Sequence, residues 1–289
     1  MVKSNIRGIY MSYKIVVDSC CELPCEYKEN SHFEIVPLTL IVGDSYEKAD
    51  DDSFDQAEFL KAVAECPTCP KSACPSPERY MEAYNTDAER VYVVTLSAKL
   101  SGSYNSAVLG SNLYHETYGD KDIYIVDSKS ASCGETQIAL KIVELEEEGL
   151  SFKEITEKIE EFVKNTHTYF VLDNLETLRK NGRLSKVKAL VASTLSIKPV
   201  MGENDGAIIQ LGQAIGIKKA LTKMVDIVIK NTSDTEGKTL MITHCNNLER
   251  AEFVKKQLED KAKFKSTIIM DTAGISSMYA NDGGVIISV

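Results

Sequence analysis

The feature that most constrains the fold is a serine-rich loop between an apolar strand and a helix. The run Arg90-Val-Tyr-Val-Val-Thr95 is almost continuously apolar, which is typical of a strand buried on both faces. The segment from Tyr104 to about Glu116 is predicted to be a helix, and residues 96–103 lie between the two. A buried strand followed directly by a helix indicates one unit of a parallel α/β sheet.

The loop itself has the character of an anion site. Open α/β sheets bind ligands where the carboxyl end of a strand meets the amino end of a helix. Unpaired backbone N–H groups and the helix dipole favour a carboxylate or a phosphate there, and Gly102 lets the backbone approach it closely. Ser97 and Ser101 are the candidate hydroxyl donors. The alternative at this point is that Ser101 and Ser103 only cap the helix.

The first part of the chain repeats the order strand, loop, helix. Strands are predicted at residues 14–18, 33–41, 90–95 and 122–127, and helices at 53–66, 77–84, 104–116 and 134–148. Ser53 with Gln56 suggests a capping box at the first of these helices. A second helix in succession, capped by Ser151 with Glu154, ends the alternation. We therefore predict a parallel α/β domain with flanking helices over residues 12–165, carrying the serine loops.

The second part has a different pattern. Strands are predicted at residues 169–172, 196–201, 207–215, 239–243, 266–271 and 284–289, with helices at 217–231 and 248–259. The strands on either side of Gly202-Glu-Asn-Asp-Gly206 form a hairpin with a loop of about five residues. Residues 166–289 are therefore predicted to be an α+β domain with a mixed or antiparallel sheet and helices on one face.

Composition excludes several classes of partner. The chain of 289 residues has a net charge of −10 and no block of lysines or arginines, so nucleic acid is not an expected partner. No run approaches the roughly 20 apolar residues of a membrane span, so stable insertion into a membrane is not expected either. The N-terminus lacks the apolar core of a secretory signal, which favours a cytoplasmic location, and the ten residues before Met11 are expected to be an extension.

The eight cysteines are expected to be reduced thiols in that location. Cys66-Pro-Thr-Cys69 with Cys74 invites a zinc or redox interpretation. Zinc requires four ligands and no second pair follows at a suitable spacing, whereas a redox Cys-x-x-Cys normally opens a helix and this one closes one. We interpret these cysteines as incidental loop thiols and predict no metal, no cofactor and no catalytic residue.

Two acidic features have competing interpretations. Asp18 ends the first strand, where it either orients the hydroxyls of the serine loop or only shapes a turn. The run from Asp50 to Asp52 is predicted to place negative charge at the start of a helix rather than to bind a cation. The glycine motifs of P-loop ATPases and dinucleotide enzymes are missing from the sequence.

Several short motifs, in this order and spacing, resemble the DegV family of bacterial fatty-acid-binding proteins. The matching stretches are Ile15-Val-Val-Asp18-Ser19, Ile35-Val-Pro-Leu38, Lys71-Ser72-Ala-Cys-Pro75-Ser76-Pro77, Leu96-Ser97-Ala-Lys-Leu100-Ser101-Gly102-Ser-Tyr104, Val126-Asp127-Ser128 and Leu178-Arg-Lys-Asn-Gly182-Arg183. The resemblance covers nearly the whole chain.

The resemblance implies a two-domain protein that holds one long-chain, palmitate-like fatty acid between its domains. The carboxylate would bind to hydroxyl side chains at Ser72 and Ser101, and the tail would lie in an apolar tunnel. In several bacteria such a protein is the carrier subunit of a fatty acid kinase, so ATP would belong to the partner and the chain itself would not be an enzyme. Arg183 would then be a partner-contact or structural residue.

The sequence departs from the family pattern at two positions. Tyr279 stands where a histidine is usual, and Ala98 replaces the second serine of a usual pair. A phenol can donate a hydrogen bond to a carboxylate but carries no positive charge near neutral pH, so a different head group is an alternative. The competing function is a small-molecule enzyme that handles acyl or phosphoryl groups at the loop from Ser97 to Ser103.

Overall fold

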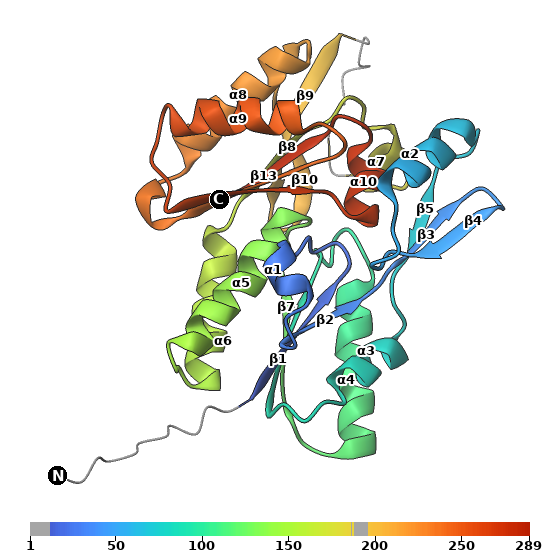
Figure 1. Cartoon of the computed structure of the whole chain (residues 1–289), viewed down its shortest axis with the longest axis vertical. Coiled ribbons are helices and arrows are strands. Elements are labelled where there is room, and N and C mark those ends of the chain that lie inside the picture. Colours follow the sequence, from blue (N-terminus) through green and yellow to red (C-terminus); the bar gives the residue numbers. More distant parts are fainter. Residues whose placement is uncertain (1–11, 186, 188–195) are drawn as a thin grey trace.

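The chain folds into three sheets, which Figure 1 shows in a computed structural model that describes residues 12–185, 187 and 196–289. The predicted extension before Met11 lies outside these residues. Sheet A has the strand order β2-β1-β6-β7, sheet B the order β4-β3-β5, and sheet C the order β10-β9-β8-β13-β11-β12. The strands are β1 Tyr13–Asp18, β2 Phe33–Val36, β3 Thr39–Val42, β4 Tyr46–Ala49, β5 Lys71–Ala73, β6 Arg90–Thr95, β7 Asp122–Asp127, β8 Thr168–Val171, β9 Ile197–Asn204, β10 Ala207–Ile215, β11 Thr239–His244, β12 Ser266–Asp271 and β13 Val285–Ser288.

The helices surround these sheets. They are α1 Cys25–Lys28, α2 Gln56–Glu65, α3 Pro77–Tyr84, α4 Ser103–Tyr118, α5 Cys133–Glu147, α6 Phe152–Asn165, α7 Glu176–Lys180, α8 Ile217–Asn231, α9 Leu248–Glu259 and α10 Gly274–Ala280, with a short 3-10 helix at Thr235–Gly237. No helix in the described ranges is long and apolar enough to cross a membrane.

Sheet A is parallel and buried on both faces, as predicted. Ile15 and Val17 of β1 pack with α5 and α6, whereas Val16 between them packs with α3 and α4 on the opposite face. Figure 1 shows these two pairs of helices on either side of the sheet. Successive side chains of a strand point to opposite faces, so continuous apolar strands need helices on both sides.

The predicted strand at 33–41 is wrong, because the segment belongs to two sheets. β2 ends at Val36 in sheet A, and β3 begins at Thr39 in the antiparallel sheet B. Pro37 lies between them, and proline has no N–H to donate to a strand ladder. Sheet B, with β3, β4 and β5, was not predicted.

Sheet C is mixed, with α8 and α9 covering one face, and it confirms the predicted architecture of the second part (Figure 1). Its hairpin differs from the prediction. Asn204 of β9 pairs with Ala207 of β10, which leaves a loop of two residues instead of five. Asp205 and Gly206 have φ angles of 48° and 80°, as a type I′ turn requires, so this turn continues the twist of the strands.

Helix starts were predicted with mixed success. Pro77 is the first residue of α3, and Ser151 with Glu154 forms the predicted capping box of α6. The predicted capping box of Ser53 with Gln56 is wrong. Helix α2 begins at Gln56 with Asp55 as its N-cap, because the Asp55 carboxylate accepts the Glu58 N–H at 2.8 Å.

Residues 12–165 and 166–289 are called the N-terminal half and the C-terminal half below, and the boundary between them stays a prediction. The halves are joined by packing as well as by the chain. Leu40 of sheet B and Phe59 of α2 lie in one apolar cluster with Ile275 and Met278 of α10. A part of the N-terminal half is therefore fixed directly onto α10 of the C-terminal half.

Candidate ligand-binding site

An apolar cavity lies between the two halves, on the face of sheet C that α8 and α9 leave uncovered. It contains about 730 Å³ of empty space, part of which is open to solvent. Its apolar wall consists of Leu96, Leu100, Ala131, Phe170, Leu172, Leu178, Ile208, Ile275, Ala280 and Ile286. Both halves contribute to this wall.

Most polar groups in the cavity wall already have hydrogen-bond partners within the protein. The Ser130 hydroxyl lies 2.5 Å from the Thr168 hydroxyl, and the Glu203 carboxylate lies 3.1 Å from His167 Nδ1. The Ser132 hydroxyl donates to the buried carboxylate of Glu22 at 2.7 Å. Because these groups satisfy each other, they demand no polar partner from a ligand.

One polar group at the cavity stands apart. The Tyr279 hydroxyl is buried and has no hydrogen-bond partner among the described residues. Burial raises the pKa of this phenol, while the nearby Arg183 guanidinium and Ser72 hydroxyl act in the opposite direction. The Arg183 guanidinium lies 5.6 Å from the centre of the Tyr279 ring. A neutral phenol, a hydroxyl and a fixed positive charge therefore meet at this end of the cavity.

Arg183 is held in place by the chain around it. Its Nε donates to the Leu100 carbonyl at 3.1 Å, and its Nη1 donates to the Asn181 carbonyl at 2.5 Å. The Asn181 side chain in turn donates to the Pro70 carbonyl at 3.0 Å. The segment from α7 to Arg183 thereby connects the serine loop to the chain just before Ser72.

Asp18 holds the serine loop in place. The buried Asp18 carboxylate accepts the Leu96 N–H at 2.9 Å and the Ser103 hydroxyl at 2.7 Å, which supports the interpretation that Asp18 orients the loop. The Ser101 hydroxyl accepts the Ser103 N–H at 3.2 Å and is half-buried at the start of α4. A Cβ on Gly102 would lie 3.0 Å from Cys74 Sγ, so glycine allows the loop to lie against the end of the β5 strand that carries Ser72.

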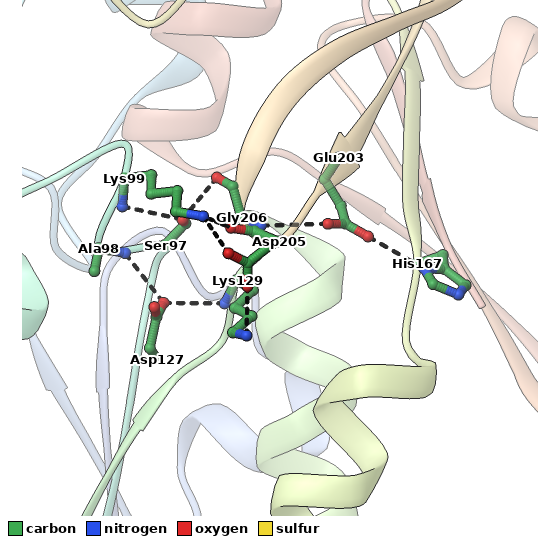
Figure 2. A network of polar contacts seen from close by, with 9 residues as sticks. All are labelled: Ser97, Ala98, Lys99, Asp127, Lys129, His167, Glu203, Asp205 and Gly206. Carbon is green, nitrogen blue, oxygen red and sulfur yellow. Dashed lines mark hydrogen bonds and ion pairs between the residues drawn. The ribbon is translucent and has the colours of Figure 1, made fainter. Parts of the chain in front are cut away.

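Ser97 was predicted to donate its hydroxyl to a bound anion, but the structure places it elsewhere. Its hydroxyl is fully buried and donates to the Gly206 carbonyl at 2.8 Å (Figure 2). Figure 2 also shows Lys99 and Lys129 on the Asp205 carboxylate, and the two lysines lower its pKa to about 2. Ser97 thus belongs to a contact between the halves, and it is not among the residues that line the cavity.

Tyr279 and Arg183 line the cavity, and Ser72 lies beside Tyr279. Ser72 and Ser101, like Ser97, are not themselves among the residues that line it. Ser97 and Gly102 support the serine loop. The apolar wall was missed from the sequence, because residues such as Phe170 and Ile286 alternate along strands in the same way as ordinary core residues. Arg183, predicted from the resemblance to be a partner-contact or structural residue, lines the cavity.

Several cysteines lie close to this polar end, and Cys20 lines the cavity. Cys66 is the C-cap of α2, as predicted, and Cys69 Sγ accepts a weak hydrogen bond from Asn181 at 3.6 Å. Within the described residues, no group of three His, Cys, Asp or Glu side chains could hold a metal ion.

These observations define a class of protein. A cavity that lies between two α/β halves, with an apolar wall and with a phenol and a guanidinium at one end, is suited to a long apolar molecule with an anionic head. The chain belongs to the DegV family, whose model, described as one of uncharacterised proteins, matches residues 12–288. A DegV domain-containing protein of Streptococcus pneumoniae is 33% identical over 284 residues, covering 96% of this chain and 98% of its own.

Solved structures show the same fold and ligands of one kind. A DegV family protein from Ruminococcus gnavus, refined with vaccenic acid, is 53% identical with a TM-score of 0.94, covering 96% of this chain and 100% of its own. The fatty acid kinase B3 protein of Streptococcus pneumoniae, loaded with linoleic acid, is 31% identical with a TM-score of 0.84, covering 96% and 99%. The two-domain α/β architecture predicted from the sequence is confirmed by these relatives.

Proposed function

We propose that this protein binds one long-chain fatty acid in the cavity between its halves. The observation that carries the proposal is the unpartnered Tyr279 hydroxyl beside Arg183 at one end of an otherwise apolar wall. The carboxylate would accept hydrogen bonds from Tyr279, Ser72 and Ser101, and Arg183 would balance its charge. Fatty acids are bound by the relatives from Ruminococcus gnavus and Streptococcus pneumoniae, which supports this choice of ligand.

The tail would supply most of the affinity. About 14 methylenes at roughly 0.8 kcal/mol each give a gross transfer free energy of about 11 kcal/mol, before the costs of ordering the ligand. The hydroxyls and the guanidinium would then decide the orientation of the molecule and favour a free acid over an ester or a hydrocarbon.

The protein would act as a carrier and not as an enzyme. The Streptococcus pneumoniae relative belongs to a fatty acid kinase, and a kinase subunit would phosphorylate the acid that this chain presents. The loop hydroxyls of Ser97 and Ser103 are committed to Gly206 and Asp18, which favours a supporting role over that of a nucleophile. Partner contact by Arg183 stays a prediction beside its proposed role at the carboxylate.

We place this activity in the cytoplasm. The ATP that such a kinase uses is found there, and all eight cysteines of the chain are unpaired, as expected in a reducing compartment.

Native mass spectrometry of the purified protein tests the function. We expect a bound mass equal to that of a long-chain fatty acid, and rebinding at micromolar concentration after delipidation. Ser72→Ala with Ser101→Ala should weaken this binding more than the control Cys66→Ser with Cys69→Ser. A delipidated protein that takes up no long-chain acid would refute the proposal, and equal losses in the two double variants would show that the head group binds elsewhere.

A further inference from the structure

Asp50 has a position that its place in an acidic run did not predict. It follows β4 of sheet B and is 3% exposed, whereas its neighbour Asp51 is exposed and accepts hydrogen bonds from Ser53. The Asp50 carboxylate reaches across to the C-terminal half, where it accepts the N–H groups of Gly274 and Ile275, each at 2.8 Å. The sequence predicted that Asp50 places negative charge at the start of α2. Its carboxylate instead binds the start of α10.

The approach between this carboxylate and α10 depends on glycine. A Cβ on Gly274 would lie 2.5 Å from Asp50 Oδ1 and 2.4 Å from the Leu40 side chain. Any other residue would displace the Asp50 carboxylate or the Leu40 side chain. Asp50 and Gly274 are therefore in close contact, and the apolar cluster of Leu40, Ile275 and Met278 surrounds them.

The two elements that Asp50 joins each carry one of the proposed head-group donors. Tyr279 lies in the last turn of α10, while Ser72 lies on β5, whose neighbour in sheet B is β3. Ser72 pairs with Leu40 across that sheet. A shift of sheet B relative to α10 would consequently change the distance between the Ser72 and Tyr279 hydroxyls.

We infer that Asp50 is a positioning residue for the carboxylate site, because it fixes α10 against sheet B and so sets the spacing of Ser72 and Tyr279. The inference rests on the proposed fatty acid function. Asp50 itself does not touch the ligand in this arrangement. Its loss should therefore weaken recognition of the acid head while leaving the apolar wall able to hold the tail.

The test compares hexadecanoic acid with its methyl ester, which has the same tail but no charge. Affinities are measured by displacement of a fluorescent fatty acid from delipidated protein. We expect Asp50→Asn to weaken binding of the acid by about tenfold, the size of a lost hydrogen bond to a charged group, and binding of the ester by less than twofold. Asp51→Asn, the same change at the exposed neighbour, should alter neither affinity.

A second set of variants asks whether Asp50 acts through the hydroxyls. In a protein with Ser72→Ala and Tyr279→Phe, adding Asp50→Asn should change the affinity for the acid by less than twofold. Asp50→Ser, which removes the carboxylate without placing an amide NH2 group against the N–H groups of α10, replaces Asp50→Asn if that variant does not fold.

The outcomes separate the two proposals. Equal losses for acid and ester, or an undiminished effect of Asp50→Asn without the two hydroxyls, would overturn the role of Asp50 while fatty acid binding stands. A wild-type protein that binds neither compound would instead refute the proposed function on which the inference rests.

Discussion

At the scale of single residues, a buried carboxyl group between the halves responds to pH. Glu22 accepts the Ser132 hydroxyl at 2.7 Å and the Ala273 N–H at 3.1 Å. Burial raises its pKa to about 7, although hydrogen bonds from Ser276, Ser132 and Ala273 act against this. Burial also raises the pKa of Asp50, to about 6. Two carboxyl groups at the first turn of α10 therefore titrate close to neutral pH.

We expect Glu22→Gln to flatten the dependence of stability on pH. Because the pKa of Glu22 is higher in the folded protein, the folded state binds its proton more tightly, and this stability is lost as pH rises from about 4.5 to 7. The loss is at most about 3 kcal/mol for this group. Urea unfolding at pH 5 and pH 8 measures it, with the exposed Glu47→Gln as the control for removing one negative charge. An unchanged slope in Glu22→Gln would contradict this assignment.

A residue at the end of a parallel strand can be predicted to act at the ligand-binding edge of the sheet, even when its partners are distant. Asp18 ends β1, and its orienting role is one of the two interpretations made from the sequence, although Leu96 and Ser103 lie 78 and 85 residues away. The partner of Asp50 is Gly274, 224 residues later, and no local spacing points to it. The same reason explains why Ser97 was not linked to Gly206, 109 residues away.

At the scale of elements, the turn between β9 and β10 shows how a two-residue loop can join the two halves. Gly206 has a φ angle of 80°, and a Cβ there would lie 2.5 Å from Ser97 Oγ and 3.2 Å from the Lys129 Cα. Glycine is thus needed for the turn and also for its contact with the N-terminal half.

Comparing two glycines separates these requirements. Gly149 has a similar φ of 76° but nothing within 4 Å of an added Cβ. Gly149→Ala should cost about 1 kcal/mol for the left-handed backbone alone. Gly206→Ala should cost roughly 2–4 kcal/mol, because crowding adds to that term. Chemical denaturation gives both values, and equal costs would mean that the contact with Ser97 adjusts freely.

Element types followed from periodicity where segments were long, and failed where they were short. The strands β1, β6 and β7 of sheet A and the helices α8 and α9 were predicted nearly to their ends. The strands β4 and β5 were missed, since four and three residues carry too little pattern. α10 was missed because Gly274-Ile-Ser-Ser-Met-Tyr279 lacks an amphipathic repeat; its fold depends on Asp50 and on packing against sheet B.

At the scale of the whole molecule, the cavity wall belongs to both halves, so a bound ligand holds them together. A ligand that binds only the folded protein raises the free energy of unfolding by about 2.7 kcal/mol when its concentration is a hundredfold above Kd.

We therefore expect hexadecanoic acid at that concentration to raise the Tm of the delipidated protein by roughly 4–5 °C in scanning calorimetry. Butanoic acid has the same head group without the long tail and should raise it far less. If the two acids shifted the Tm equally, the tail would not lie in the cavity.

The position of β13 in sheet C has a consequence for biosynthesis. β10, β9 and β8 form one group of strands and β11 with β12 forms another, and β13 pairs with β8 on one side and β11 on the other. A ribosome makes Val285–Ser288 long after sheet A is complete. The C-terminal sheet can be closed only when these residues emerge, and Ile286 then adds its side chain to the cavity wall. A nascent chain consequently has a finished serine loop well before it has an enclosed place for a ligand.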